Sequence, residues 1–191
     1  MCGIVGYVGE RDCTDVLLDS LSKLEYRGYD SAGIAVFENG EITVEKAKGE
    51  LKNLREKVAE HKPMGHCGIG HTRWATHGEP SDINSHPHGN KRVSIVHNGI
   101  IENYKDIKNF LIDKGYTFIS ETDTETVAKL LDYYYEGDPV DAIIKTLKDV
   151  RGAYALGIVF KDFPDRIFAV RKDSPLIIGA GDEENFIASD V

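Results

Sequence analysis

The apolar positions of this chain follow two spacings, and each spacing predicts a different kind of element. In residues 15–26 the leucines and valine recur every three or four positions, which is typical of an amphipathic helix. An Asp-Thr-Glu run at residues 123–125 leads into another such pattern. Gly115 stands where the helix before that run, at residues 103–114, would stop. The spacing predicts further helices at residues 51–60, 103–114, 125–135 and 138–150.

Short apolar runs rich in β-branched residues predict strands between these helices. The runs at residues 32–37 and 42–46 flank Asn39-Gly40, a strong signal for a two-residue hairpin turn. Another predicted strand covers residues 93–97 and stops at Asn98-Gly99. The remaining predicted strands are residues 4–8, 67–72, 153–160, 167–171 and 176–178, with a strand-like segment at residues 185–191.

The order of these elements indicates an α+β fold. Strands and helices both cluster and alternate, and the strands include hairpins, so we expect mixed or antiparallel sheets covered by helices. Stacked sheets between two helix layers are the architecture that this pattern favours. A length of 191 residues suits one domain with a substantial core, so we expect residues 1–191 to form a single domain.

Composition and charge narrow the function classes. Hydrophobic residues make up 41% and the net charge is −9, which argues against non-specific nucleic-acid binding and against an anionic membrane surface. No apolar run approaches the roughly 20 residues of a membrane span. The first residues lack the positive region of a secretory signal, and three cysteines are an odd number without paired spacing. We therefore expect a cytoplasmic protein without disulfides.

Residues 75–90 have little periodicity and predict a long functional loop. The chain has seven histidines, and several lie in or beside this loop, but their spacing matches no zinc signature. We expect His86-Pro87-His88 to be solvated, and we expect neither a metal site nor a cofactor.

The position of Cys2 points to chemistry, because only Met1 precedes it. Removal of Met1 would place a thiol and a free α-amine on one residue. The amine has a pKa of about 7.7–8.0 and the thiol one of about 8.5, so the amine could accept the proton of the thiol. This is the arrangement of an N-terminal nucleophile. The alternative is that Cys occupies this position by chance and Met1 is retained.

Three further clusters contain groups suited to an amide substrate. Arg73 at a strand end could grip a carboxylate with two parallel hydrogen bonds, and Trp74 beside it could be a lid. The Asn98 amide and the Gly99 N–H could form a pair of oxyanion donors. Asp123 could bind an ammonium group. The structural alternatives are a surface ion pair for Arg73, a core position for Trp74, an ordinary turn at Asn98-Gly99 and a helix cap for Asp123.

Together these clusters resemble the class II glutamine amidotransferases of the N-terminal nucleophile hydrolase superfamily. Six phrases occur in the family's order and cover essentially the whole chain: MCGIVG (1–6), LEYRGYDSAG (24–33), HTRWATHGEP (71–80), VHNGIIEN (96–103), SETDTE (120–125) and RGAY (151–154). The resemblance implies a four-layer αββα sandwich of two antiparallel sheets. No catalytic position of this chain departs from the family's pattern.

The resemblance implies a role for each of these residues. Cys2 would attack the side-chain amide of L-glutamine and form a γ-glutamyl thioester, and Asn98 and Gly99 would form the oxyanion hole. Arg73 would bind the α-carboxylate and Asp123 the α-ammonium. Thr76, His77, Gly99 and Trp74 would shape the pocket, with Trp74 also acting as a gate.

The wording of the second and third phrases is closest to the family members that aminate a sugar. In these, ammonia passes through a channel to a C-terminal isomerase domain that converts fructose 6-phosphate to glucosamine 6-phosphate. The resemblance therefore implies a glutaminase domain cut from a longer, homodimeric enzyme, whose isomerase domain is absent from this chain. Two alternatives stay open: the glutaminase domain of another class II amidotransferase, and a non-catalytic glutamine-binding module. A peptide or acyl amidase of the same superfamily is disfavoured, because Arg73 and Asp123 together would read both charges of a free amino acid.

Overall fold

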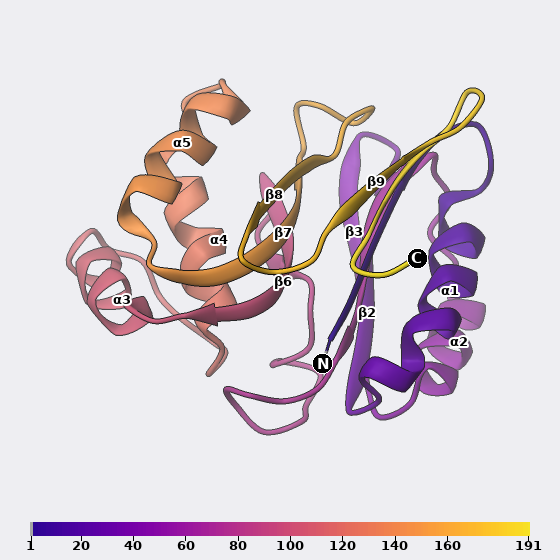
Figure 1. Cartoon of the computed structure of the whole chain (residues 1–191), viewed down its shortest axis with the longest axis horizontal. Coiled ribbons are helices and arrows are strands. Elements are labelled where there is room, and N and C mark those ends of the chain that lie inside the picture. The colour runs from indigo at the N-terminus through magenta and orange to yellow at the C-terminus, as the bar shows by residue number, and fades with distance from the viewer. Residues whose placement is uncertain (1) are drawn as a thin grey trace.

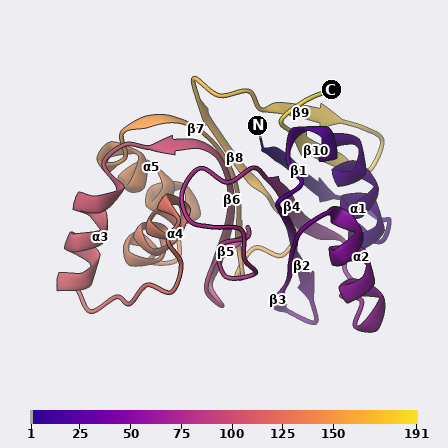
Figure 2. The ribbon, with the colours of Figure 1, turned by 90° about the horizontal axis from the view of Figure 1, so that it is seen from below.

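Four layers make up the computed structural model, which describes residues 2–191 (Figure 1). Helices α1 (Cys13–Leu24) and α2 (Leu51–Glu60) cover one flank, and α3 (Tyr104–Asp113), α4 (Asp123–Tyr134) and α5 (Pro139–Asp149) cover the other. Two antiparallel sheets lie between them, and the view from below separates the same layers (Figure 2). The predicted α+β sandwich of stacked sheets between helices is confirmed.

The larger sheet has six strands in the order β3-β2-β4-β1-β10-β9, and the smaller has four in the order β5-β6-β7-β8. The strands of the first are β1 (Gly3–Val8), β2 (Ser31–Glu38), β3 (Glu41–Lys48), β4 (Cys67–Arg73), β9 (Ile177–Ala180) and β10 (Asn185–Ala188). Those of the second are β5 (His88–Gly89), β6 (Val93–Ile101), β7 (Gly152–Phe160) and β8 (Phe168–Lys172).

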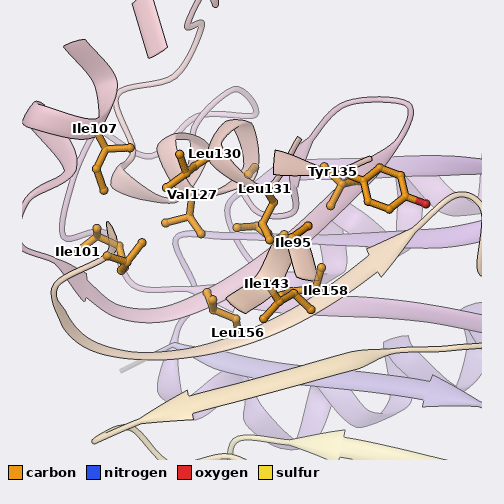
Figure 3. Packing of buried hydrophobic residues seen from close by; sticks show 14 of the residues in the cluster. Ile95, Ile101, Ile107, Val127, Leu130, Leu131, Tyr135, Ile143, Leu156 and Ile158 are labelled. Carbon is orange, nitrogen blue, oxygen red and sulfur yellow. The ribbon is translucent and has the colours of Figure 1, made fainter. Parts of the chain in front are cut away.

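Three apolar cores fill the spaces between the four layers. Leu17, Leu21 and Leu54 pack between the first helix pair and the six-stranded sheet. Neighbouring residues of β6 belong to different cores among the other two, because side chains alternate between the faces of a strand. Val96 joins the core between the sheets, whereas Ile95 joins the core under α3, α4 and α5 (Figure 3).

The local signals in the sequence locate most element boundaries to within a few residues. Asn39 and Gly40 both have positive φ, 52° and 80°, so the predicted hairpin turn joins β2 and β3. The first helix begins at Cys13, where Asp12 accepts a hydrogen bond from Thr14 N at 3.0 Å. Its last predicted turn is a separate 3₁₀ helix, Glu25–Arg27. Within residues 2–191, no helix has the length and apolarity needed to cross a membrane.

One predicted boundary is wrong, and it lies at the candidate site. Strand β6 continues through Asn98 and Gly99 to Ile101 and stays paired with β7, where Gly99 is opposite Tyr154. Gly99 has a φ of 111°, and a Cβ there would lie 2.1 Å from the carbonyl oxygen of Ala153. The Asn-Gly pair therefore marks a distortion inside a strand that only glycine fits, instead of a turn.

Candidate active site

A pocket of about 360 Å³ brings the predicted site residues together. Antiparallel pairing of Gly3 with Thr72 sets the start of β1 beside the end of β4, so Cys2 and Arg73 are neighbours. Strand β6 and the first turn of α4 contribute from the other sheet and its helix layer. The predicted residues that line the pocket are Cys2, Arg73, Trp74, Thr76, His77, Asn98, Gly99 and Asp123.

The thiol of Cys2 is held by the backbone of Trp74. Trp74 N–H donates to Cys2 Sγ at 3.2 Å, and Sγ lies 3.5 Å from the Trp74 carbonyl oxygen. Burial raises the pKa of the Cys2 thiol, and the hydrogen bond with the Trp74 backbone partly offsets this rise. Formation of the thiolate at neutral pH therefore depends on a base close to Sγ. The predicted base needs removal of Met1, which lies outside the described residues.

The amide of Asn98 faces the nucleophile. Its Nδ2 donates to the carbonyl oxygen of Cys2 at 3.0 Å, so the amide hydrogens point toward the residue that carries the thiol. Gly99, the next residue of β6, also lines the pocket. Asn98 therefore places a side-chain hydrogen-bond donor beside Cys2, and Gly99 forms part of the wall of the same pocket.

Arg73 is buried, with 3% of its surface exposed, and the following loop folds around it. Its guanidinium donates to the carbonyl oxygens of His77 and Gly78 and lies 3.9 Å from the Asp30 carboxylate. At this distance the Asp30 contact is a loose ion pair rather than a bidentate one. The positive charge of Arg73 is therefore buried next to the pocket without a closely bound carboxylate.

Asp123 supplies a buried negative charge in the same pocket, with 4% of its surface exposed. Its Oδ2 accepts a hydrogen bond from Ile101 N at 2.9 Å, and its position in the first turn of α4 also favours a carboxylate. Among residues 2–191, no lysine or arginine forms an ion pair with it. Thr122, the preceding residue, is the helix cap, so the alternative of Asp123 as the cap is wrong.

The outer part of the pocket consists of the loop after β4. Trp74 is 48% exposed and makes an edge contact with Tyr29, the ring centroids being 5.4 Å apart. The His77 ring makes a similar contact with Tyr104. Trp74 is thus not a core residue, and this part of the pocket has an exposed apolar rim.

The expectation that His86 and His88 are solvated is wrong, because both are at most 5% exposed. Strand β5 pairs with β6, with His88 opposite Ile95, and this pairing draws the end of the loop into the molecule. The His86 ring stacks on His71 with centroids 4.0 Å apart, and burial keeps the pKa of both imidazoles low. Within the described part of the chain, no three His, Cys, Asp or Glu residues are arranged to hold a metal ion.

Several lining residues were not predicted as site residues from the sequence, and two of them, Ser174 and Pro175, lie outside every predicted cluster. They lie between β8 and β9, a connection whose sequence looks like an ordinary turn. Arg27 also lines the pocket, and its guanidinium forms an ion pair with Asp190 at 2.8 Å. Arg27 belongs to one of the six family phrases, but the sequence could not show that this arginine reaches the pocket.

Comparisons with known proteins identify the family of this chain. Residues 71–191 match the family model described as glutamine amidotransferase domain. The chain is 58% identical over its full length to the glutamine–fructose-6-phosphate aminotransferase (isomerizing) of Clostridium perfringens, and 54% identical to that of Thermus thermophilus. In both cases it spans 32% of the relative's length.

Solved structures share the fold. The glutamine phosphoribosylpyrophosphate amidotransferase of B. subtilis, in complex with ADP and GMP, is 26% identical, with a TM-score of 0.86 over 98% of this chain and 42% of that one. A class-II glutamine aminotransferase domain protein from Silicibacter pomeroyi, at 14% identity and a TM-score of 0.70, shows the fold alone. The family model covers more than half of the chain, and the relatives align from end to end. The chain therefore belongs to the glutamine amidotransferase domain family.

Proposed function

We propose that this chain hydrolyses L-glutamine to L-glutamate and ammonia through a γ-glutamyl thioester on Cys2. The observation that carries the proposal is the joint placement of a thiol, an amide donor and two buried opposite charges in one pocket. A free α-amino acid carries one carboxylate and one ammonium, which these two charges complement. Its side-chain amide would then be left for the thiol.

The two buried charged side chains recognise the substrate. The Arg73 guanidinium binds the α-carboxylate, and the Asp123 carboxylate binds the α-ammonium. Neither charge is closely paired within the described residues, so the ligand would supply the missing partners. Thr76, His77 and the backbone of Gly99 shape the remaining wall, and Trp74 forms the outer edge as a gate.

The reaction proceeds in two halves. The α-amine that Cys2 carries once Met1 is removed takes the thiol proton, and Sγ attacks the amide carbon of glutamine. The tetrahedral intermediate collapses when the amine returns this proton to the leaving nitrogen, which releases ammonia and the thioester. A water molecule then gives a proton to the α-amine and attacks the thioester carbon, glutamate leaves, and the amine passes that proton to the departing thiolate.

The oxyanion of each tetrahedral intermediate needs donors that are already in place. The Asn98 amide has one hydrogen on the Cys2 carbonyl oxygen and a second available for the oxyanion. The Gly99 N–H is the second donor in this proposal. Such donors act through preorganisation, since they need no rearrangement when the charge develops.

The use of the ammonia is a proposal about a longer protein. The chain spans about a third of its curated relatives, whose name describes the transfer of nitrogen from glutamine to fructose 6-phosphate. We infer that the ammonia formed here aminates fructose 6-phosphate to glucosamine 6-phosphate on a C-terminal isomerase domain of a cytoplasmic homodimer. Trp74 at the pocket edge would control the passage of ammonia to that domain.

Glutamate release from L-glutamine tests the proposal directly, on protein whose mass shows that Met1 is absent. Cys2→Ala should abolish release while glutamine still binds in calorimetry. Cys67→Ala is the matched control, because Cys67 is buried away from the pocket and should tolerate the change with activity retained. No release from the processed wild type, or release that survives Cys2→Ala, would contradict the proposal.

A further inference from the structure

A buried imidazole lies behind the oxyanion donor and is not part of the pocket lining. We propose that His71 is a positioning residue that fixes the Asn98 side chain with its NH₂ group toward Cys2 and its oxygen away from it. The inference rests on the proposed function, because it concerns the donor that stabilises the tetrahedral intermediates. Its direct observation is the contact of 3.0 Å between His71 Nε2 and Asn98 Oδ1.

A second contact of His71 Nε2 shows that this nitrogen is the donor, and the donor in turn fixes the orientation of the Asn98 amide. His71 Nε2 also lies 2.9 Å from the carbonyl oxygen of His97, which can only accept. Nε2 therefore carries the proton and donates to both oxygens. If the Asn98 amide were turned over, its NH₂ would face this donor and its oxygen would face the Cys2 carbonyl oxygen, so that both contacts would become repulsive.

The surroundings of His71 keep the ring neutral and in place. Its side chain is fully buried and stacks on His86 with ring centroids 4.0 Å apart. Burial lowers the pKa of His71 to about 3, so the imidazole carries a single ring proton at neutral pH. The other nitrogen, Nδ1, has no hydrogen-bond partner among the described residues, so the protein offers that proton no alternative acceptor.

The contact also joins the two sheets at the point where the site is assembled. His71 belongs to β4 of the six-stranded sheet, where it pairs with Ile4 of β1, two residues after Cys2. Asn98 belongs to β6 of the other sheet. The nucleophile and the oxyanion donor therefore come from different sheets, and the hydrogen bond from His71 to Asn98 joins these two sheets beside the site.

This arrangement predicts a specific catalytic effect. A freely rotating Asn98 amide would often present its oxygen to the developing oxyanion, which repels it. Fixing the amide removes the molecules in which the oxygen faces the oxyanion before the reaction starts. This is the preorganisation on which such donors depend. Loss of His71 should therefore slow turnover without weakening the binding of glutamine, because Arg73 and Asp123 are untouched.

Two amide substitutions of His71 separate positioning from bulk packing. The nitrogen of glutamine reaches about as far as imidazole Nε2, whereas that of the shorter asparagine reaches only about as far as Nδ1. In the processed protein, His71→Asn should lower kcat for L-glutamine roughly 10- to 100-fold, with KM changed less than about twofold. His71→Gln should retain most of the wild-type kcat. Equal losses in the two variants would overturn the proposal.

A double-mutant cycle tests whether His71 acts through Asn98. In an Asn98→Ala background, His71→Asn should add little further loss of kcat, because the side chain that it positions is gone. A full additional loss in that background would overturn the proposal. Alkylation of Cys2 by iodoacetamide needs no oxyanion donor, so its rate should be the same in wild type and His71→Asn. A large fall in that rate would show that the substitution damages the nucleophile instead.

A measurement on the wild type keeps the proposal testable if His71→Asn does not fold. Nitrogen-15 shifts of the His71 ring at pH 7.5 should show a protonated Nε2 and an unprotonated Nδ1. The opposite tautomer, or a doubly protonated ring, would overturn it. Wild-type protein without glutaminase activity would count against the proposed function, whereas active wild type with the wrong tautomer would count against the role of His71 alone.

Discussion

The pocket has two ends that are built differently. The reaction end consists of Cys2, which directly precedes β1, and of Asn98 and Gly99 inside β6. The recognition end consists of Arg73 and Asp123 together with the loop that follows β4. At the reaction end, a direct hydrogen bond of 3.0 Å joins the residues of the two sheets. At the recognition end, Arg73 is held by carbonyl oxygens of its own loop.

This difference separates the two tasks of the site. Asn98 and Gly99 are held by pairing with β7, and Cys2 directly precedes the paired strand β1. This attachment leaves little freedom, which suits donors that must meet an oxyanion without rearrangement. Loop carbonyls around a guanidinium can move when a substrate carboxylate competes for the same donors. We therefore expect substitutions at the reaction end to lower kcat and substitutions at the recognition end to raise KM.

Among substitutions that keep the nucleophile, removal of the oxyanion donor has the largest expected effect. Asn98→Ala should lower kcat about 10²- to 10³-fold and change KM little, because the amide acts on the transition state. Steady-state glutaminase kinetics measure both values. Asn103→Ala is the matched control, since its amide donates to the Asp149 carbonyl oxygen at 2.7 Å outside the pocket. A kcat for Asn98→Ala within twofold of the wild type would contradict the expectation that substitutions at the reaction end lower kcat.

A smaller effect is expected at the recognition end. Asp123→Asn keeps the acceptor for Ile101 N but removes the charge, so KM for L-glutamine should rise roughly 10-fold with kcat nearly unchanged. The decisive substrate is 4-carbamoylbutanoate, which lacks the α-amino group. Asp123→Asn should lose the preference for glutamine over this analogue, whereas Asp138→Asn, at the start of α5, should keep it. An unchanged preference in Asp123→Asn would mean that another group binds the α-ammonium.

Sequence patterns located most of the fold because its elements follow from local rules. The spacing of leucines predicted α1, and Asn39-Gly40 predicted the β2–β3 turn, because these signals depend on a few adjacent residues. The residues of the site were also predicted, since each stands in a distinctive phrase. Their roles remain predictions.

The features that the sequence did not reveal depend on contacts between distant segments. Asn98-Gly99 looks like a turn until β7 is placed beside it, and the pairing then continues past both residues. His86 looks solvated until β5 pairs with β6 and carries it between the sheets. Ser174 reaches the pocket only because β8 and β9 belong to different sheets, which sends their connection across the site.

The smallest effect per residue is expected from the buried histidines in and beside the pocket. Burial lowers the pKa of four of them: His71, His86, His88 and His97. In the unfolded chain a histidine titrates near 6.5, so below this pH the unfolded state takes up protons that the native state does not. The free energy of unfolding should therefore fall as the pH drops from about 6.5 toward 3, by at most about 1.4 kcal/mol per histidine and pH unit.

Urea unfolding at pH 7.5 and 5.5 measures this effect in a range where most carboxylates stay ionised. His61 and His66 are exposed, so His61→Gln and His66→Gln should leave the difference between the two pH values unchanged. His88→Gln should reduce it, because one neutral buried imidazole is removed. Equal stability at both pH values would mean that the imidazoles are protonated in the native state. That result would also contradict the neutral His71 on which the orientation of Asn98 at the reaction end depends.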